Sequence, residues 1–336
     1  MRNYRPLRPS SLTRMIPPSR TAPPSRPNRR RPSAAPLVLG VLGVGGLLIL
    51  AGAAESKAEG PLRVTGSTTV NVVVAEAAEV LRERHGIAIL VDTTGGSTGG
   101  VTSAADGRAD LGMSSRSIDD RDRARHPEAD LREIAIGADA VAMVVSRDVW
   151  EGGVRALTAD QLRAIYEGRV RNWSRLGGPD LRLVFFNKEP GRGTWEVFAD
   201  FLYDQADKAP AIAHPEVGAN EEVRSKVGGT RGALSFVSAP WADGERVFAL
   251  SLRREDGSVV APTAAAVADH RYPLGRPLFL ITNGDPSPQA RLMIDFLLGQ
   301  EGRAIVRRHG FVPAATATSS ATADKADNAS VTAGRR

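Results

Sequence analysis

Loops that lead from a short apolar strand into a helix through glycine and hydroxyl residues are the feature that most constrains this fold. The clearest follows the apolar run Ile87–Val91, where Gly95–Gly100 supplies four glycines among hydroxyl side chains. Gly66–Val70 and Gly191–Thr194 repeat the arrangement. Any single loop could be a tight turn that merely needs glycine. Three such loops at helix starts instead favour backbone N–H groups and hydroxyls that converge on one small anion.

The strongly basic composition belongs to one end of the chain. The 336 residues carry a formal net charge of +6, but nine arginines and no acids lie within residues 1–36. The remainder holds 35 basic and 38 acidic residues, so it is slightly acidic and gives no case for nucleic-acid binding. Residues 1–36 are rich in Pro, Ser and Arg, and we expect them to form a disordered leader.

Residues 37–54 form an apolar segment that ends in small residues, a pattern typical of a secretory signal. We expect cleavage after Ala53 or Ala54, and an uncleaved membrane anchor is the alternative. The sequence contains no cysteine, which excludes lipid attachment through a lipobox, disulfides and thiolate metal sites. The arginines place the N-terminus in the cytoplasm and the rest outside.

Strands that alternate with helices indicate an α/β fold with a mostly parallel sheet. Ligands of such sheets bind beyond the carboxyl ends of the strands, where the glycine loops lie. We expect separate strands at 134–136 and 140–146, and one long amphipathic helix over 288–308. Residues 314–336 are dominated by Ala, Thr, Ser and Asp and should form a disordered tail.

The side chains around the loops favour binding over catalysis. Arg116, Lys188 and Arg192 add positive charge beside the loops, which suits a tetrahedral dianion. A phosphoester enzyme would need a nucleophile with a base, or paired metals. No such group appears, and we expect no metal, no cofactor and no enzymatic activity. The histidines are scattered without metal-ligand spacing: His85, His126, His214, His270 and His309.

Five motifs in order carry a family resemblance. They are Gly66-Ser67-Thr68-Thr69-Val70, Gly95–Gly100, Ala109-Asp110-Leu111-Gly112-Met113-Ser114-Ser115-Arg116, Leu157–Trp173 and Gly191-Arg192-Gly193-Thr194. Over about Leu62 to Pro313 the chain resembles the phosphate-binding proteins of bacterial phosphate ABC importers.

The resemblance implies a two-lobe periplasmic-binding-protein-like fold of type II, in which each lobe is a mostly parallel sheet flanked by helices. Residues 60–138 and 247–313 would form lobe 1, and residues 139–246 lobe 2. Ala140–Ser146 and Val247–Leu252 would be the two crossing strands that join the lobes. Such a pair of strands permits hinge closure around a ligand.

The resemblance also implies a set of phosphate-binding residues. From lobe 1 these are Ser67, Thr68, Thr69, Ser97, Thr98, Ser114, Ser115 and Arg116. From the hinge and lobe 2 they are Asp139, Lys188, Arg192, Gly193 and Thr194.

Three positions depart from the family pattern. Lys188 stands where an arginine is usual, and Arg192 replaces a serine. Lysine is a point charge where arginine would bind two oxygens, and Arg192 could restore the guanidinium from its neighbouring position. Ser115 stands where better-studied members carry an aspartate that accepts the proton of hydrogen phosphate and so excludes sulfate. Asp139 could substitute for that acceptor, and the preference for phosphate over sulfate stays open.

The function implied by the resemblance is an exported, periplasmic solute-binding protein, a monomer that captures inorganic phosphate between two lobes. It would deliver the phosphate to an ABC permease in the inner membrane. The alternative is an oxyanion-binding signalling or scavenging protein that meets no permease and stays anchored through residues 37–54.

Overall fold

The structure is a computed structural model that describes residues 60–315. The predicted leader (1–36), the apolar segment (37–54) and all but the first two residues of the predicted tail (314–336) lie outside the described residues. Within residues 60–315, none of the helices combines the length and apolar character needed to cross a membrane.

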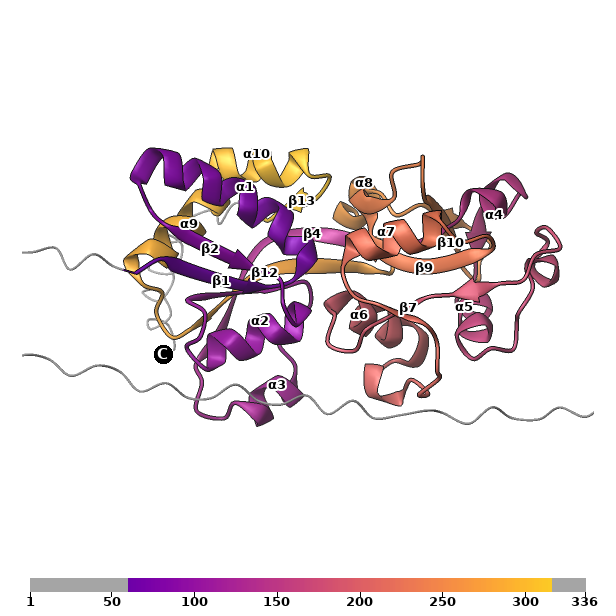
Figure 1. The fold of residues 1–336 in the computed structure, drawn as a ribbon, viewed down its shortest axis with the longest axis horizontal. Helices are drawn as coiled ribbons and strands as arrows, with labels where there is room; N and C mark the ends of the chain where they lie inside the picture. The colour runs from indigo at the N-terminus through magenta and orange to yellow at the C-terminus, as the bar shows by residue number, and fades with distance from the viewer. Residues whose placement is uncertain (1–59, 316–336) are drawn as a thin grey trace, which may run out of the picture. The chain divides into compact units, whose positions relative to one another are not determined.

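Strands and helices alternate through most of the described residues (Figure 1). The strands are β1 (Leu62–Gly66), β2 (Ile89–Asp92), β3 (Leu111–Ser114), β4 (Leu131–Val145), β5 (Ala156–Leu157), β6 (Val184–Phe185), β7 (Asn187–Lys188), β8 (Glu216–Val217), β9 (Ala233–Ser238), β10 (Phe248–Arg253), β11 (Val259–Val260), β12 (Gly275–Asn283) and β13 (Val312–Pro313). The α-helices are α1 (Thr68–His85), α2 (Gly96–Ala105), α3 (Asp120–Arg125), α4 (Arg147–Glu151), α5 (Ala159–Tyr166), α6 (Gly193–Tyr203), α7 (Asn220–Gly228), α8 (Ala264–Ala268), α9 (Pro288–Leu298) and α10 (Gln300–Arg308). Short 3₁₀ turns are η1 (Trp173–Leu176), η2 (Ala206–Lys208) and η3 (Ala239–Trp241).

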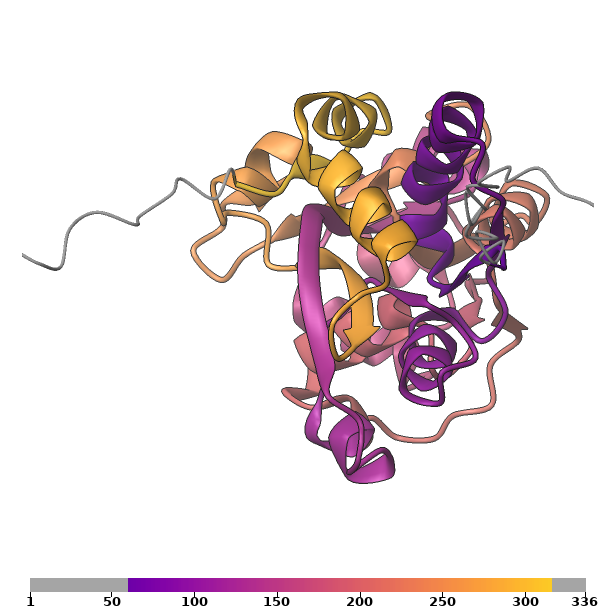
Figure 2. The ribbon, with the colours of Figure 1, turned by 90° about the vertical axis from the view of Figure 1, so that its left-hand side faces the viewer.

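The first lobe is a sheet covered by helices on both faces. Strand β1 lies between β2 and β3 and is parallel to both, whereas β12 pairs with β3 in the antiparallel sense. Helices α1, α9 and α10 share one apolar core with β1 and β3. Helix α2 packs on the opposite face through Val101 and Ala104 (Figures 1 and 2).

Helix α1 shows why the sequence forms a helix directly after the first glycine loop. The hydroxyl oxygen of Ser67 accepts a hydrogen bond from the backbone N–H of Thr69 at 3.2 Å and so caps the first turn. Val70, Val73, Val74, Ala77 and Leu81 recur at helical spacing and are all buried against the sheet. The helix ends at Gly86, whose φ of 66° is the left-handed conformation that glycine adopts readily.

The second lobe forms around the far half of β4. Strands β9 and β10 flank β4 on opposite sides, and both are antiparallel to it. Strand β6 then extends the sheet parallel to β9. The core gathers aromatic side chains, among them Trp173 and the stacked pair Phe198 and Phe236, whose ring centroids lie 4.1 Å apart.

Two strands connect the lobes (Figure 1). The first part of β4, Leu131–Ala140, pairs with β12 in the first lobe, and its last part, Val141–Val145, pairs with β9 in the second. Residues just before β12, including Tyr272 and Leu274, belong to the core of the second lobe. The chain therefore crosses once along β4 and returns at the start of β12.

This arrangement corrects the expected return crossing at Val247–Leu252. Strand β10 pairs with β4, β5 and β11 and stays within the second lobe. Its buried side chains Phe248, Leu250 and Leu252 belong to that lobe's core, as do residues of α8. A lobe boundary at residue 247 does not fit these contacts, because the return lies near Gly275.

Three other expectations differ from the structure. The strands expected at 134–136 and 140–146 form one continuous strand, because β12 pairs across Gly137–Asp139 with only a register shift. The long helix expected over 288–308 is two helices, since Gly299 is extended, with φ of −72° and ψ of 175°. The sheet is mixed rather than mostly parallel, because β4 is antiparallel to β9, β10, β12 and β13.

Candidate functional site

The first glycine loop brings the start of α1 against the end of β3. The backbone N–H of Ser67 donates to the carbonyl oxygen of Met113 at 2.9 Å. Gly66 has a φ of 138°, and a Cβ there would lie 2.2 Å from that same carbonyl oxygen. Only glycine therefore allows the two backbones to approach this closely. The close approach places Ser67 beside the loop that follows β3.

The hydroxyls of three loops meet at this point. Ser67 Oγ donates to Ser115 Oγ at 3.1 Å, and Ser97 Oγ lies 3.3 Å from Ser115 Oγ. The backbone N–H of Ser115 donates to Ser97 Oγ at 3.1 Å. Ser67 and Ser97 stand at the starts of α1 and α2, and all three serines are buried. The first lobe thus presents a hydroxyl cluster beside two helix N-termini.

The third glycine loop brings the second lobe onto this cluster. Helix α6 begins at Gly193, and a Cβ there would lie 2.6 Å from Ser97 Oγ and 2.8 Å from Ser115 Oγ. The backbone N–H of Thr98 donates across the junction to the carbonyl oxygen of Gly191 at 3.1 Å. Glycine at position 193 is therefore what allows the start of α6 to reach the hydroxyls of the other lobe.

A small cavity of about 10 Å³ lies where the loops meet. Nine of the predicted site residues line it, together with Gly96: Ser67, Thr68, Thr69, Ser97, Ser115, Lys188, Arg192, Gly193 and Thr194. That volume is about the room for one water-sized sphere. A larger ligand would need the surrounding side chains, or the two lobes, to move apart.

Arg276, at the start of β12, is a residue of the candidate site that sequence reasoning missed. Its guanidinium is buried and donates to Thr194 Oγ1 at 2.9 Å, Thr69 Oγ1 at 3.0 Å and Ser115 Oγ at 3.1 Å. It therefore joins hydroxyls of both lobes. The sequence could have indicated Arg276 by its position, because it is a single charged residue directly before the apolar run 277–281.

Asp139, on β4, pairs with Arg276 from the hinge side. Its Oδ2 accepts from Nη2 of Arg276 at 2.7 Å and from Nε at 3.0 Å, and both side chains are 1% exposed. The carboxylate does not line the 10 Å³ cavity. Asp139 thus holds the guanidinium in place and compensates its charge.

Lys188 is the second buried cation at the site. Its Nζ donates to the carbonyl oxygen of Gly218 at 2.8 Å and to Asn220 Oδ1 at 3.1 Å. Burial, followed by repulsion from Arg276 and Arg192, lowers the pKa of Lys188 to about 7. An anion in the cavity would favour the charged ammonium. The fraction of Lys188 that is protonated near pH 7 should therefore rise when an anion occupies the cavity.

Three further predicted residues lie outside the cavity lining. Ser114 Oγ donates to the carbonyl oxygen of Arg116 at 2.7 Å. Arg116 is turned away, because its guanidinium contacts Asp122 and Glu196, and its Nη2 donates to Thr98 Oγ1 at 3.1 Å. Thr98, Ser114 and Arg116 therefore surround the site, as Asp139 does, and do not line the cavity.

Arg192 lines the cavity but already has an acidic partner. Its Nη2 and Nε donate to Glu189 Oε2 at 2.7 and 3.0 Å, and its side chain is 17% exposed. A Cβ at Gly96 would lie 2.8 Å from Arg192 Cδ, so glycine leaves room for the arginine stem. Arg192 therefore sits at the rim, with much of its charge compensated.

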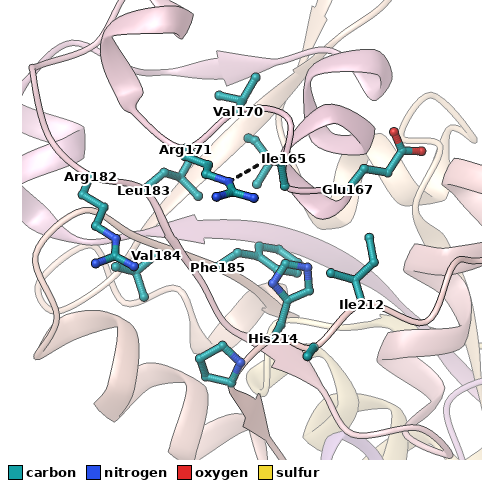
Figure 3. A pocket seen from close by; sticks show the side chains of 13 residues that line it. Ile165, Glu167, Val170, Arg171, Arg182, Leu183, Val184, Phe185, Ile212 and His214 are labelled. Carbon is teal, nitrogen blue, oxygen red and sulfur yellow. Dashed lines mark hydrogen bonds between the residues drawn. The ribbon is translucent and has the colours of Figure 1, made fainter.

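A larger pocket of about 340 Å³ lies elsewhere in the second lobe (Figure 3). Apolar side chains such as Phe185 and Ile212 line it, together with Arg171, Arg182 and His214. The Nε2 of His214 bonds the carbonyl oxygen of Tyr166 at 2.6 Å. None of the predicted site residues is among its lining residues, so the small loop cavity is the candidate site. Among residues 60–315, no cluster of three or more His, Asp or Glu side chains could hold a metal ion.

Two α/β lobes that meet on converging glycine loops, with crossing strands behind them, define a two-lobe binding protein. Comparison with known families gives the same class, because the PBP superfamily domain matches residues 51–301. The chain belongs to this superfamily of periplasmic-binding-protein-like proteins. The predicted two-lobe α/β fold class and the predicted family resemblance are thereby confirmed.

Individual relatives are similar over most of their length. The chain is 27% identical to the phosphate-binding protein PstS of Bacillus subtilis (strain 168), over 77% of this chain and 82% of that protein. A Clostridium perfringens protein solved with bound phosphate is 26% identical, with a TM-score of 0.68, covering 76% of this chain and 100% of that one. An ABC-type phosphate transport receptor from Vibrio cholerae is 25% identical, with a TM-score of 0.59, over 75% and 99% of the two chains.

Proposed function

We propose that this chain is an exported solute-binding protein that captures inorganic phosphate between its two lobes and delivers it to an ABC permease. The proposed ligand contacts are the hydroxyls, backbone N–H groups and cations that line the loop cavity, together with Arg276. Thr98, Ser114, Arg116 and Asp139 would support those contacts from behind. The protein binds its ligand and does no chemistry on it.

The observation that carries this proposal is the meeting of glycine loops from both lobes with two buried cations. Arg276 and Lys188 supply positive charge, and residues at the starts of α1, α2 and α6 line the same small volume. Each charge-assisted hydrogen bond contributes about 1.5–3 kcal/mol. Micromolar binding needs about 8 kcal/mol in total, so a handful of such bonds suffices.

Hinge motion at β4 and the start of β12 would open the site. The two strands are the covalent links between the lobes, so a small rotation there would separate Thr98 from Gly191 and Ser115 from Gly193. A tetrahedral anion would enter between the lobes and would then be held by groups from both. Each lobe alone presents only part of the contacts.

The names of the relatives support phosphate as the ligand. The Bacillus subtilis relative is called a phosphate-binding protein, and the Clostridium perfringens structure holds phosphate. Those proteins also support the transport role, since the Vibrio cholerae relative is an ABC-type phosphate transport receptor. The arginine-rich leader followed by the apolar segment 37–54 supports export to the periplasm.

Two experiments test the proposal separately. Isothermal titration of the protein with phosphate should give one site with micromolar or tighter affinity. Addition of the phosphate-loaded protein to vesicles that contain the organism's phosphate permease should stimulate ATP hydrolysis. Binding without stimulation would leave the oxyanion-binding role intact and remove the permease from it.

A further inference from the structure

Asn220, the first residue of α7, is a buried amide that joins the two lobes at the candidate site. Its side chain is 1% exposed. Its Nδ2 donates to Thr69 Oγ1 in the first lobe at 3.1 Å, and its Oδ1 accepts from Lys188 Nζ in the second lobe at 3.1 Å. One side chain therefore contacts two residues that line the cavity, each with a different atom.

The contact between Asn220 Oδ1 and Lys188 sets the direction of the Lys188 ammonium. An ammonium has three N–H donors. The carbonyl oxygen of Gly218 and Oδ1 of Asn220 take two of them, at 2.8 and 3.1 Å. Because Lys188 lines the cavity, the third donor is left for a ligand there. Without the Asn220 oxygen, the ammonium could turn toward other acceptors.

The contact between Asn220 Nδ2 and Thr69 determines whether the Thr69 hydroxyl donates or accepts toward the cavity. A hydroxyl oxygen has two lone pairs and one O–H. Asn220 Nδ2 and Arg276 Nη2 both donate to Thr69 Oγ1, at 3.1 and 3.0 Å, and so occupy both lone pairs. The O–H of Thr69 is then free only to donate. Thr69 lines the cavity, and a fixed donor there suits an anion.

An amide is the side chain that meets both requirements, since it has a donor and an acceptor at its two ends. A carboxylate at position 220 would offer two acceptors, and a leucine of similar size would offer neither. We propose that Asn220 is a positioning residue for anion binding, which aims Lys188 at the ligand and fixes Thr69 as a donor. This inference rests on the proposed function of the same site.

Asn220→Leu and Asn220→Asp test the proposal, with phosphate as the titrated ligand. We expect Asn220→Leu to weaken phosphate binding about 10- to 100-fold, the loss that follows when charge-assisted hydrogen bonds are misdirected. Asn220→Asp should weaken it further, because the new carboxylate repels the anion and competes for Lys188. Asn283→Leu is the matched control. Asn283 also uses both ends of its amide, with Asp130 N and Ala105 O at 2.9 Å, but lies within the first lobe.

A double-mutant cycle separates positioning from a general structural role. In a Lys188→Met background, Asn220→Leu should cost much less than it does in the parent, because one of the two groups it positions is already gone. Equal costs in both backgrounds would overturn the proposal. So would an Asn220→Leu variant that binds phosphate within threefold of the parent.

A ligand-free measurement keeps this inference distinct from the proposed function. NMR titration of the Lys188 ammonium should show a lower pKa in Asn220→Leu than in the parent, because the amide oxygen no longer stabilises the charged form. An unchanged pKa would contradict the proposed contact. If the parent binds no phosphate but the pKa of Lys188 is still lower in Asn220→Leu than in the parent, the proposed function is overturned and the Asn220 contact is retained.

Discussion

Four cations lie at the junction between the lobes, and they differ in what compensates them. Arg276 and Lys188 are both buried, Lys188 in the lining of the cavity and Arg276 directly behind it. Arg276 donates to one carboxylate, Asp139, and to three hydroxyls, whereas Lys188 contacts only neutral oxygens. Arg116 and Arg192 lie around the cavity and are paired with acids: Asp122 and Glu196 for the first, Glu189 for the second. An anion gains most from the cations that reach the cavity. Lys188 lines it, and Arg276, although paired with Asp139, donates to three hydroxyls that line it.

The comparison teaches that nearness in sequence to a glycine loop is a poor guide to which cation binds. Arg116 and Arg192 each follow or occupy such a loop, yet acids hold their guanidinium groups. Arg276 is distant from every glycine loop in the sequence, yet its guanidinium touches hydroxyls from both lobes. The predictions below follow from this contrast, from the largest expected effect to the smallest.

Arg276→Met should have the largest effect. It removes the donor to Thr69, Ser115 and Thr194 and leaves Asp139 buried without a partner. We expect phosphate binding to weaken by about a thousandfold, since truncating one partner of a buried charge pair costs about 2–5 kcal/mol. Titration calorimetry measures the loss. The double variant Arg276→Met with Asp139→Asn should regain melting temperature but not affinity, and a single variant with parent-like affinity would remove Arg276 from the site.

Lys188 should give the binding affinity a characteristic pH dependence. Without ligand, its pKa is lowered to about 7 by burial and by Arg276 and Arg192. A bound dianion favours the ammonium, so above pH 7 binding must take up a proton and affinity should fall, by up to about tenfold per pH unit. Lys188→Arg stays charged and should lack this fall.

The ratio of parent to Lys188→Arg affinity, measured from pH 7 to 9, cancels the ligand's own ionisation. We expect this ratio to fall steadily as the pH rises over that range. A constant ratio would mean that Lys188 keeps its proton throughout and that its burial has no effect on binding.

Arg192→Ser should have a smaller effect than its place in the glycine loop suggests. Glu189 compensates its guanidinium at 2.7 Å, and the side chain is partly exposed at the rim. We expect phosphate affinity to fall by about three- to tenfold, the scale of a partly screened contact. A loss above a hundredfold, measured by the same titration, would show that Arg192 leaves Glu189 and binds the anion directly.

Arg116→Met should change stability more than affinity. Its loss would leave Glu196 without its cation and Asp122 with only Arg125, at 3.7 Å, and both carboxylates are at least nine-tenths buried. Breaking such a group costs about 3–5 kcal/mol, so the melting temperature should drop by several degrees. Affinity measured below that temperature should stay within about tenfold of the parent. A parent-like melting temperature with a large affinity loss would reverse the assignment.

Features set by local chemistry could be predicted from the sequence. Gly66, Gly96 and Gly193 are needed because a Cβ would collide with a neighbouring backbone or side chain, and strand, glycine and helix start are adjacent in the chain. The capped, amphipathic α1 is local in the same sense. Nine of the predicted residues therefore line one cavity.

Features set by distant partners could not be predicted. Arg276 and Asn220 reach the site only because β12 and α7 fold back onto it, and neither residue carries a local glycine signal. Strand β10 reads as an apolar run that could pair anywhere, and only its pairing with β5 and β4 keeps it in the second lobe. The pairing of Arg116 could be predicted only in part, because one of its acidic partners, Glu196, lies 80 positions away on α6.

The most direct test of the central claim is calorimetric titration of the protein with phosphate and with sulfate, beside Arg276→Met. We expect phosphate to bind the parent at one site with micromolar or tighter affinity and to lose about a thousandfold in the variant. Sulfate should compete, because no carboxylate lines the cavity to accept a ligand proton. A parent protein that gives no binding heat and no rise in melting temperature with either anion would contradict the account.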